Sequence, residues 1–237
     1  MKKIAIIIPT YEESENIQRL VKQIKFYIHN VIIFIIDDTP SAQISKMFKP
    51  NNKEVKYFHR KNKKGRGSAV LFGIKKALRD NQIDMIIEMD ADFSHNPNEL
   101  KNKINYFKRN NLDMLIASRY LKSSEILNWS YFRRIFSFLS NFLARIFLRI
   151  DLKDFTNGFR LYSIRAAKKI IKKCGNIGDG FIILSEIIVV VHNSHYTIRE
   201  LPTIFKNRKR GKSSVTLKLI FQSLFGLIKL SLIKKKL

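Results

Sequence analysis

Short apolar runs alternate with longer segments of helical periodicity along the first half of the chain. The apolar runs are rich in β-branched residues, which is typical of strands buried on both faces of a sheet. The apolar runs lie at residues 3–8, 31–36, 55–58, 85–89 and 114–117, and the helical segments between them lie at 13–28, 67–80 and 98–110. This alternation predicts βαβ units with right-handed crossovers, and therefore an α/β fold with a mostly parallel central sheet.

The second half of the chain predicts longer helices and fewer strands. The expected elements are helices at 131–150, 178–191 and 215–233, a strand at 196–202 and a basic loop at 205–214. At about 100° per residue, Arg133 and Ser137 share one arc of the first of these helices, and large apolar side chains fill the other arc. We therefore expect a single Rossmann-like domain at 1–212, followed by an amphipathic, basic helix at 213–237.

Composition and charge narrow the classes of function. The chain has 237 residues, 45% of them hydrophobic, so it can bury the core of one sizeable domain. Lys and Arg outnumber Asp and Glu by 45 to 19, and the net charge of +26 favours polyanions, anionic membranes or phosphorylated substrates as partners. A basic nucleic-acid-binding protein is the alternative from another class, but it leaves the acidic loops described below unexplained. The single cysteine, Cys174, excludes an internal disulfide framework and fits a reducing compartment such as the cytoplasm.

No segment reaches the roughly 18 to 20 apolar residues that a transmembrane helix needs. The two best uncharged runs, 135–144 and 219–228, are bounded by Arg or Lys. Amphipathic helices of this kind bury their apolar face in the membrane interface, and Lys234 to Lys236 would each add about 1 kcal/mol near an anionic leaflet. We expect a peripheral protein on the cytoplasmic face of a membrane, without a transmembrane segment. The alternative is that the segment 215–233 simply packs on the domain.

Acidic and polar residues follow the predicted strands at the points where these strands end. The stretches that do so are 8–14, 36–41, 89–94 and 117–120. The carboxyl ends of parallel strands share one edge of a sheet, and ligands bind at that edge. Asp90 and Asp92 are either turn residues or carboxylates that hold a divalent cation together with substrate phosphates. Asp37 and Asp38 are either turn and helix-capping acids or acceptors for a nucleobase or ribose.

Basic residues and a hydroxyl predict a phosphate site beside these acids. Arg133 and Ser137 are spaced i, i+4 on one helix face, and a guanidinium with a hydroxyl matches the donors that a phosphate needs. Arg119 lies in the loop after the fifth strand, and Arg208 lies in the basic loop. The alternative for each of these cations is a solvated basic surface. Gly73 would let its helix pack closely against the sheet.

Eight stretches of the chain resemble, in order and spacing, the dolichol-phosphate (polyprenol-phosphate) mannose synthases. These stretches are "IPTYEESENI", "IIDDTPS", "HRKNKKGRGSAVLFG", "MDADFSHNP", "ASRY", "NWSYFRRIFS", "DFTNGFRLYS" and "FKNRKRGKSS". The enzymes of this family are inverting family 2 glycosyltransferases with a GT-A fold. The resemblance covers residues 3–214, which is nearly the whole chain.

The resemblance implies a reaction and its partners. Mannose would move from GDP-mannose to a dolichyl or polyprenyl phosphate, giving a lipid-linked monosaccharide donor for protein glycosylation or glycan synthesis. The implied cofactor is Mg²⁺ or Mn²⁺. The chain would bind a membrane surface directly or be recruited by a small membrane-anchoring partner protein. Because a phosphate monoester has a second pKa of about 6, the acceptor is largely dianionic near neutrality and needs no general base.

The family's functional residues carry over to matching positions of this chain. By similarity, the nucleoside would be held by Pro9, Tyr11, Glu13, Asp37 and Asp38. The metal ion and the donor diphosphate would be held by Asp90 and Asp92, next to Ala91, and Arg208 would reach the donor phosphates. The acceptor phosphate would be held by Arg119, Arg133 and Ser137. The residues implied to carry catalysis are Asp92, Arg119 and Arg133.

The chain also departs from the family pattern. The usual Asp-Gly-Thr does not follow the acid pair, Ser94 stands where relatives often have Gln, and Ser214 stands where a Ser-Lys pair usually ends the late loop. These departures keep UDP-glucose or another nucleotide sugar open as the donor, and a non-catalytic membrane scaffold open as a function. Glu186 lies at a position that is acidic in the family and is a candidate for a structural role.

Overall fold

A seven-stranded sheet forms the centre of the computed structural model, which describes residues 2–41, 43–48, 52–61, 65–178, 182–207, 217–234 and 237. The strand order across this sheet is β3-β2-β1-β4-β7-β5-β8. Its strands are β1 (Lys3–Thr10), β2 (Val31–Asp37), β3 (Val55–His59), β4 (Ile83–Glu88), β5 (Met114–Ser118), β7 (Arg160–Ser163) and β8 (Ile198–Pro202). All pairs are parallel except those of β7, which runs antiparallel to β4 and β5. The predicted α/β fold with a mostly parallel sheet is confirmed.

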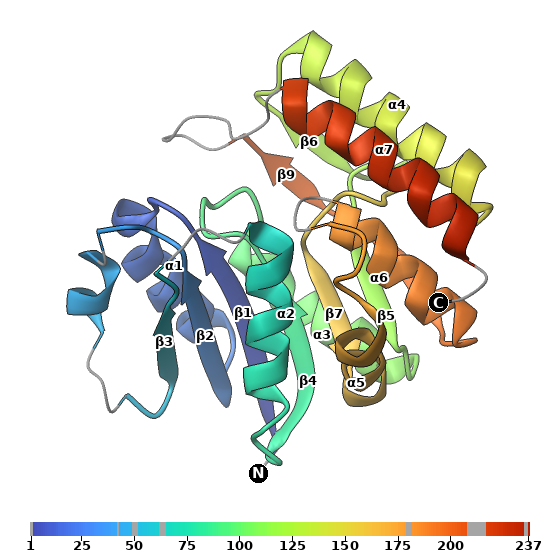
Figure 1. The fold of residues 1–237 in the computed structure, drawn as a ribbon. Coiled ribbons are helices and arrows are strands. Elements are labelled where there is room, and N and C mark those ends of the chain that lie inside the picture. The colour runs from blue at the N-terminus through green and yellow to red at the C-terminus, as the bar shows by residue number, and fades with distance from the viewer. Residues whose placement is uncertain are drawn as a thin grey trace.

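Helices cover both faces of the sheet (Figure 1). The helices on one face are α2 (Arg66–Ala77), α5 (Ile164–Lys173) and α6 (Ile182–Asn193), and those on the other are α1 (Ser14–Tyr27) and α3 (Leu100–Arg109). Short 3-10 turns occur at η1 (Gln43–Met47) and η2 (Pro97–Glu99). Alternate side chains of β2 enter opposite cores: Phe34 and Ile36 lie with α2, and Ile33 and Ile35 lie with α1. This two-sided burial explains why β2 is apolar from Val31 to Ile36.

Two further helices, α4 (Tyr131–Leu148) and α7 (Leu217–Ile233), lie side by side outside these layers (Figure 1). A small parallel sheet of β6 (Glu125–Leu127) and β9 (Ile204–Lys206) lies near them. The last helix, α7, contacts both α4 and α6 and buries Leu227 and Leu230, so it does pack on the domain. No helix in the described part of the chain combines the length and the apolar character needed to cross a bilayer.

The pattern of apolar residues fails to predict β6, β7, α5 and β9. Strand β7 has the sequence "RLYS", whose polar ends give no apolar run. Its Arg160 is nonetheless fully buried, because its guanidinium donates to the carbonyl oxygens of Phe155, Asn157 and Leu184. The helix predicted at 131–150 ends earlier, at Leu148, because Arg149 adopts a left-handed backbone conformation with φ 57°.

Gly73 has the packing role that the sequence predicts for it. A Cβ atom at this position would lie 2.4 Å from Cγ2 of Ile7 in β1, closer than two carbon atoms can approach. Glycine therefore sets how near α2 lies to the sheet, and with it the position of the amino end of α2 above the strand ends.

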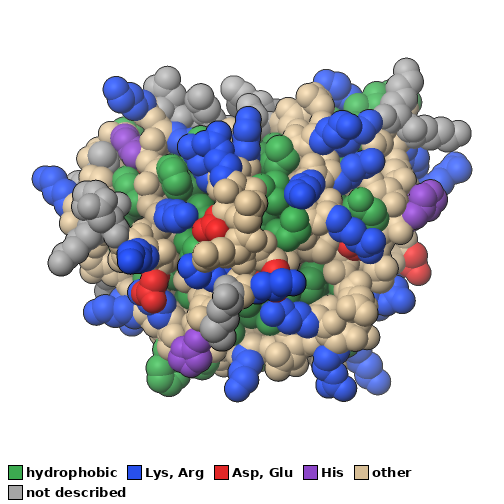
Figure 2. Space-filling model, turned by 90° about the horizontal axis from the view of Figure 1, so that it is seen from below, with side chains coloured by type: hydrophobic (Ala, Val, Ile, Leu, Met, Phe, Trp, Pro, Cys, Tyr) green, Lys and Arg blue, Asp and Glu red, His purple; other side chains and the backbone are tan. Residues whose placement is uncertain are grey.

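Positive charge is spread widely over the surface. Figure 2 views the molecule from below, where the chain begins and where the amino ends of the parallel strands lie. Lys and Arg side chains are scattered over this whole face, with apolar side chains, other groups and a few acids between them. Much of the net charge of +26 therefore lies far from the carboxyl ends of the strands, and a cation near those ends needs a specific contact before it can be assigned a role.

Candidate active site

The carboxyl ends of the parallel strands meet at one edge of the sheet, as predicted. Thr10 of β1 pairs with Asp37 of β2. Arg160, at the start of β7, pairs with Glu88 of β4 on one side and with Ile116 of β5 on the other. The loops that follow β1, β2, β4 and β5 therefore emerge at the same edge, together with the loop that enters β7. This edge is where an α/β sheet binds its ligands.

Asp37 is fully buried at this edge and is bonded within the chain. Its Oδ1 accepts hydrogen bonds from the Thr10 hydroxyl at 3.1 Å and the Thr39 N–H at 3.0 Å, and its Oδ2 accepts from the Tyr57 hydroxyl at 2.7 Å. Burial, followed by the bond to Asp37, raises the pKa of Tyr57. The bond to Thr39 is that of an Asx-type turn, so the geometry gives Asp37 the turn role. Its contact with a nucleoside stays a prediction.

Asp38 is held by Arg60, to which the sequence pattern assigned no role. Nε and Nη2 of Arg60 each donate to one carboxylate oxygen of Asp38 at 2.6 Å, and Nη1 donates to Ser68 at 2.9 Å. This bidentate pair joins the end of β2 to the beginning of α2.

The other residues predicted to hold the nucleoside lie on and after β1. Pro9 is partly buried and Tyr11 is exposed, and the neighbouring charge of Glu12 raises the pKa of Tyr11. Glu13 accepts a hydrogen bond from the side chain of Asn16 at 2.8 Å. Tyr11 is thus the exposed residue of the three, and their contact with a nucleoside stays a prediction.

Hydrogen bonds shape the loop that carries Asp90 and Asp92. Oδ1 of Asp92 accepts from the N–H of Ser94 at 3.0 Å. Nδ1 of the buried His95 accepts from the N–H of Asp90 at 3.0 Å, and its Nε2 lies 2.9 Å from Oδ1 of Asn157. Because Nδ1 accepts, the proton is on Nε2, which donates to Asn157. His95 thus ties this loop to the segment that precedes β7.

Arg66, the first residue of α2, binds the first acid of the pair. Its Nε and Nη2 donate to Oδ1 of Asp90 at 2.9 and 2.7 Å, and its Nη1 donates to Oε1 of Glu88 at 2.7 Å. Burial alone would lower the pKa of Arg66, but the charges of Asp90 and Glu88 outweigh it and raise that pKa. Glu88 is fully buried and also accepts from the Tyr162 hydroxyl at 2.7 Å. Two carboxylates therefore share one guanidinium.

Asp90 and Asp92 suit a divalent cation that also has phosphate ligands. Both side chains are partly exposed at the strand edge. Within the described residues, no cluster of three or more His, Cys, Asp or Glu side chains could hold a metal by itself. Mg²⁺ is usually held by one or two carboxylates together with substrate phosphates. The donor set therefore fits a metal ion that arrives with a diphosphate.

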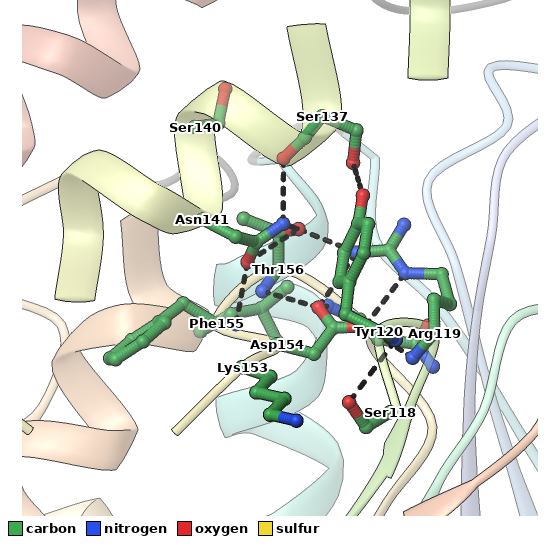
Figure 3. A network of polar contacts seen from close by, with 12 residues as sticks. Ser118, Arg119, Tyr120, Ser137, Ser140, Asn141, Lys153, Asp154, Phe155 and Thr156 are labelled. Atoms are coloured by element: carbon green, nitrogen blue, oxygen red, sulfur yellow. Dashed lines mark hydrogen bonds and ion pairs between the residues drawn. The ribbon is translucent and has the colours of Figure 1, made fainter. Parts of the chain in front are cut away.

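Arg119 lies in a buried network at the end of β5 (Figure 3). Its Nε and Nη2 donate to the two oxygens of Asp154 at 2.8 Å each, its N–H donates to Asp154 at 2.9 Å, and Nη2 also donates to Thr156 at 2.6 Å. Burial alone would lower the pKa of Arg119, but the charge of Asp154 outweighs it and raises that pKa. Arg119 is therefore a buried, paired cation and not a solvated surface cation.

Arg133 and Ser137 extend from α4 toward the same region. The guanidinium carbons of Arg133 and Arg119 lie 4.2 and 5.5 Å from the ring centre of Trp129, so one indole ring contacts both cations. Nη1 of Arg133 donates to the side chain of Asn207 at 2.9 Å. Ser137 accepts from the hydroxyl of Tyr120, the neighbour of Arg119, at 2.6 Å (Figure 3). The structure thus brings together the three residues predicted to hold the acceptor phosphate.

Several of these partners were missed by reasoning from the sequence. Arg60, Arg66 and Asp154 lie within the quoted stretches, but nothing in their spacing shows which acid pairs with which base. Arg208, predicted to reach the donor phosphates, lies outside the described residues. Glu186 is buried in α6 and accepts from the N–H groups of residues 175 and 176 at 3.0 and 3.3 Å, which is a structural role.

These features define a class of protein, namely a doubly wound α/β domain that has an acidic loop and buried arginines at its strand ends. The sequence model of glycosyl transferase family 2 matches residues 5–171. The chain therefore belongs to glycosyl transferase family 2.

Two curated relatives align with 94% of the chain. A dolichol-phosphate mannosyltransferase of Pyrococcus furiosus is 33% identical over 228 residues, and a polyprenol monophosphomannose synthase of Mycolicibacterium smegmatis is 28% identical over 228 residues. The chain spans 62% of the length of the first protein and 85% of the second. The names of both relatives agree with the family that the sequence resembles.

A crystal structure of glucosyl-3-phosphoglycerate synthase from Mycobacterium tuberculosis has the same fold. It covers 99% of this chain and 80% of its own, with a TM-score of 0.67 and 11% identity. That crystal contains Mn²⁺, uridine diphosphate and glucosyl-3-phosphoglycerate. At this identity the likeness concerns the fold alone, and it confirms the predicted GT-A architecture.

Proposed function

We propose that the chain transfers a sugar from a nucleotide-sugar donor to a polyprenyl phosphate at a membrane surface, with inversion at the anomeric carbon. The donor that we propose is GDP-mannose, in keeping with the names of the two curated relatives. The observation that carries the proposal is helix α4. It contributes Arg133 and Ser137 to the cluster of polar groups beside Arg119 on one side and exposes large apolar side chains on the other.

The orientation of α4 is the reverse of that of an ordinary surface helix. Its polar side faces the protein: Asn141 is buried and accepts from the N–H of Phe155 at 2.7 Å. Its apolar side faces outward, where Phe132 and Phe138 are 76% and 59% exposed. A polyprenyl phosphate has the same two parts, an anionic head and a hydrocarbon chain. The phosphate would lie against Arg133 while the chain stays in the lipid beside α4.

Helix α7 also exposes large apolar side chains. Phe225 and Leu232 on α7 are 71% and 79% exposed, and α7 packs beside α4. Exposed apolar patches mark sites that bind a membrane or a protein partner. Lys234, whose ammonium donates to the carbonyl oxygens of Phe147 and Leu148 at 2.8 and 3.0 Å, adds a positive charge at the end of α4. We therefore propose that 213–237 acts as a membrane-surface element although it also packs on the domain. Lys235 and Lys236 lie outside the described residues.

The acceptor would be activated by its own charge and oriented by the arginines. A phosphate monoester is largely dianionic near neutrality, since its second pKa is about 6, so it can attack the anomeric carbon without a general base. Arg133 and Arg119 would hold this anion in line with the departing diphosphate, which is catalysis by positioning and electrostatics. Asp154 and Thr156 hold the guanidinium of Arg119 before substrate arrives.

The donor would be held at the acidic loop. A divalent cation bound there, Mg²⁺ or Mn²⁺, would neutralise the charge that develops on the leaving diphosphate. Asp90 and Asp92 would hold that ion with the diphosphate oxygens, and residues 9–13 with Asp37 and Asp38 would form the nucleoside end. The acidic side chains thus serve a site whose two substrates are both anions.

The test is a product assay with a panel of donors. The purified chain is incubated with GDP- and UDP-sugars, a short polyprenyl phosphate and Mg²⁺ or Mn²⁺, and lipid-linked product is detected by mass spectrometry. Mannosyl product from GDP-mannose supports the proposal, and the Asp92→Ala variant should give none. Product from UDP-glucose alone would correct the donor, and transfer only to a water-soluble phosphate such as 3-phosphoglycerate would refute the lipid acceptor.

A second test addresses the membrane surface. The variant Phe132→Ser/Phe138→Ser should sediment less with vesicles of phosphatidylcholine and phosphatidylglycerol, because it loses two large exposed rings from α4. The matched control is Phe26→Ser on α1, since Phe26 is also 76% exposed but lies on a different part of the fold. Equal vesicle binding by both variants and the wild type would exclude α4 as the docking surface.

A further inference from the structure

We infer that Trp129 is a further substrate-binding residue, whose indole N–H donates a hydrogen bond to the phosphate of the acceptor. The inference rests on the proposed function, because it assumes that an anionic acceptor binds beside Arg119 and Arg133. Neither the sequence pattern nor the family resemblance assigned a role to Trp129. Its role follows from a buried donor and from the charges around that donor.

The first reason is that the indole nitrogen is buried and unpaired. Trp129 is 9% exposed, and among the residues that the structure describes its Nε1 has no hydrogen-bond acceptor. A buried Trp N–H usually has a partner, because an unpaired donor loses the hydration that it has in water. In the described part of the chain only two other buried side-chain atoms are in this state, an oxygen of Asp84 and the hydroxyl of Ser94. A donor this rare is a candidate for binding a polar ligand.

The second reason is that two cations surround the same ring. The guanidinium carbon of Arg133 lies 4.2 Å from the ring centre and that of Arg119 lies 5.5 Å from it. Nε1 belongs to this ring, so it lies within a few ångströms of both guanidinium groups. The face of an indole ring attracts cations, whereas its N–H edge attracts anions. An oxyanion beside the ring can accept from the N–H and from the arginines together, so the arrangement fits a phosphate better than a neutral hydroxyl.

The third reason is that the chain fixes the position of the ring. Asn128 has a left-handed backbone conformation, with φ 61°, and turns the chain from β6 toward α4 just before Trp129. The side-chain amide of Asn207 donates to the carbonyl oxygen of Asn128 at 3.0 Å and accepts from Nη1 of Arg133 at 2.9 Å. The ring of Phe205 packs edge-on against the indole at 5.3 Å. The N–H is thus oriented before a ligand arrives, as donors of an anion site must be.

The variant Trp129→Phe separates the N–H from the ring. Phenylalanine keeps an aromatic face for the two arginines but has no donor. Its affinity for farnesyl phosphate, measured by isothermal titration calorimetry, should fall at least about tenfold, because a hydrogen bond to an ionised group is lost. Its affinity for GDP should stay unchanged, whereas a general loss of structure would weaken both ligands. Equal affinity of Trp129→Phe and the wild type for farnesyl phosphate would overturn the inference.

A matched control removes a polar group from another aromatic ring. Tyr27→Phe does this on α1, where Tyr27 is 38% exposed and outside the candidate site. This variant should bind farnesyl phosphate as the wild type does. If it loses as much affinity as Trp129→Phe, the indole N–H is not the cause and the inference is refuted.

A second measurement observes the N–H itself and needs no variant. The chain contains a single tryptophan, so its ¹H–¹⁵N spectrum has one indole signal, which reports on Trp129 alone. Farnesyl phosphate should move this signal downfield, because a hydrogen bond to an anion deshields the proton. Farnesol, with the same hydrocarbon chain but no phosphate, should leave it in place. An indole signal that stays unmoved at saturating farnesyl phosphate would overturn the inference even if Trp129→Phe does not fold.

Other ligands identify which anion the N–H binds. Inorganic phosphate should move the indole signal in the same direction as farnesyl phosphate, but only at higher concentration, because it lacks the hydrocarbon chain. A larger shift with GDP than with farnesyl phosphate would assign the N–H to the donor diphosphate, and a shift with GDP-mannose alone would assign it to the sugar. Either result would refute the inference. If the wild type binds no farnesyl phosphate, the proposed function itself is wrong; if it binds the lipid with an unmoved indole signal, only the role of Trp129 is wrong.

Discussion

Replacing Asp154 with Asn should destabilise the fold far more than the same change at Asp151, three residues away. Asp154 is fully buried against Arg119, whose side chain is 6% exposed, whereas the Asp151 side chain is 87% exposed in its pair with Arg145. The asparagine loses the charge that compensates a buried guanidinium, and its amide group would face donors. Breaking a buried pair in this way costs about 3 to 5 kcal/mol.

That loss is large beside the total stability of a domain, which is about 5 to 15 kcal/mol. For a chain of this size each 1 kcal/mol lowers Tm by about 2 to 4 °C, so Asp154→Asn should lower Tm by roughly 6 to 20 °C. Asp151→Asn should cost less than about 1 kcal/mol, because exposed ion pairs contribute little. Thermal unfolding at pH 7, followed by circular dichroism, measures both. Similar Tm values for the two variants would refute the assignment of Arg119 and Asp154 as a buried pair.

The pH dependence of this difference has a definite sign. Burial alone would raise the pKa of Asp154, but the Arg119 charge and the N–H donors outweigh it and lower that pKa below its ordinary value. A lowered folded-state pKa contributes stability above the unfolded value of about 3.9, and that stability is lost as the pH falls through the folded-state pKa. The Tm difference between wild type and Asp154→Asn should therefore be full at neutral pH and shrink in acid.

Three further variants or reactions test single features of the fold. Gly73→Val should lower Tm, because even its Cβ would lie 2.4 Å from Ile7, and overpacking typically costs about 1 to 3 kcal/mol. His95→Phe keeps a ring in place but leaves the N–H of Asp90 without its acceptor, so the free energy of unfolding should fall by about 1 to 3 kcal/mol. Urea titration measures this loss, and an unchanged unfolding midpoint would contradict the bond between Asp90 and His95. Burial raises the pKa of the Cys174 thiol, so it should react slowly with Ellman's reagent at pH 8 until urea unfolds the chain.

Part of this architecture could be predicted from local pattern alone. The strands Val31–Asp37 and Met114–Ser118 are apolar up to their last residue because both of their faces are covered, and a run of that kind is visible without coordinates. The acids after the strands are likewise visible, and their common edge follows from the parallel arrangement. Strand β7 is the counterexample, since Arg160 satisfies its charge on carbonyl groups that come together only after folding.

In the candidate site, too, the sequence determines one part of the arrangement and the tertiary structure decides the rest. The order of residues in the sequence determined that Asp90, Asp92 and Arg119 lie near the strand ends, because each follows a predicted parallel strand. Tertiary structure alone decided that Arg66 binds Asp90 across 24 residues and that Arg119 binds Asp154 across 35. The spacing of residues along the sequence does not predict such pairs, because the energy of an ion pair depends on burial and on the distance between the charges, and not on their separation along the chain.

Helix α4 shows the same division most plainly. Periodicity in the sequence determined that the segment has a polar arc and an apolar arc. Only the packed structure decided that the polar arc with Asn141 faces inward and the rings of Phe132 and Phe138 face outward. A hydrophobic pattern specifies which side chains share a face, whereas the direction of that face depends on the neighbouring elements that supply hydrogen bonds, here the N–H of Phe155 to the side chain of Asn141.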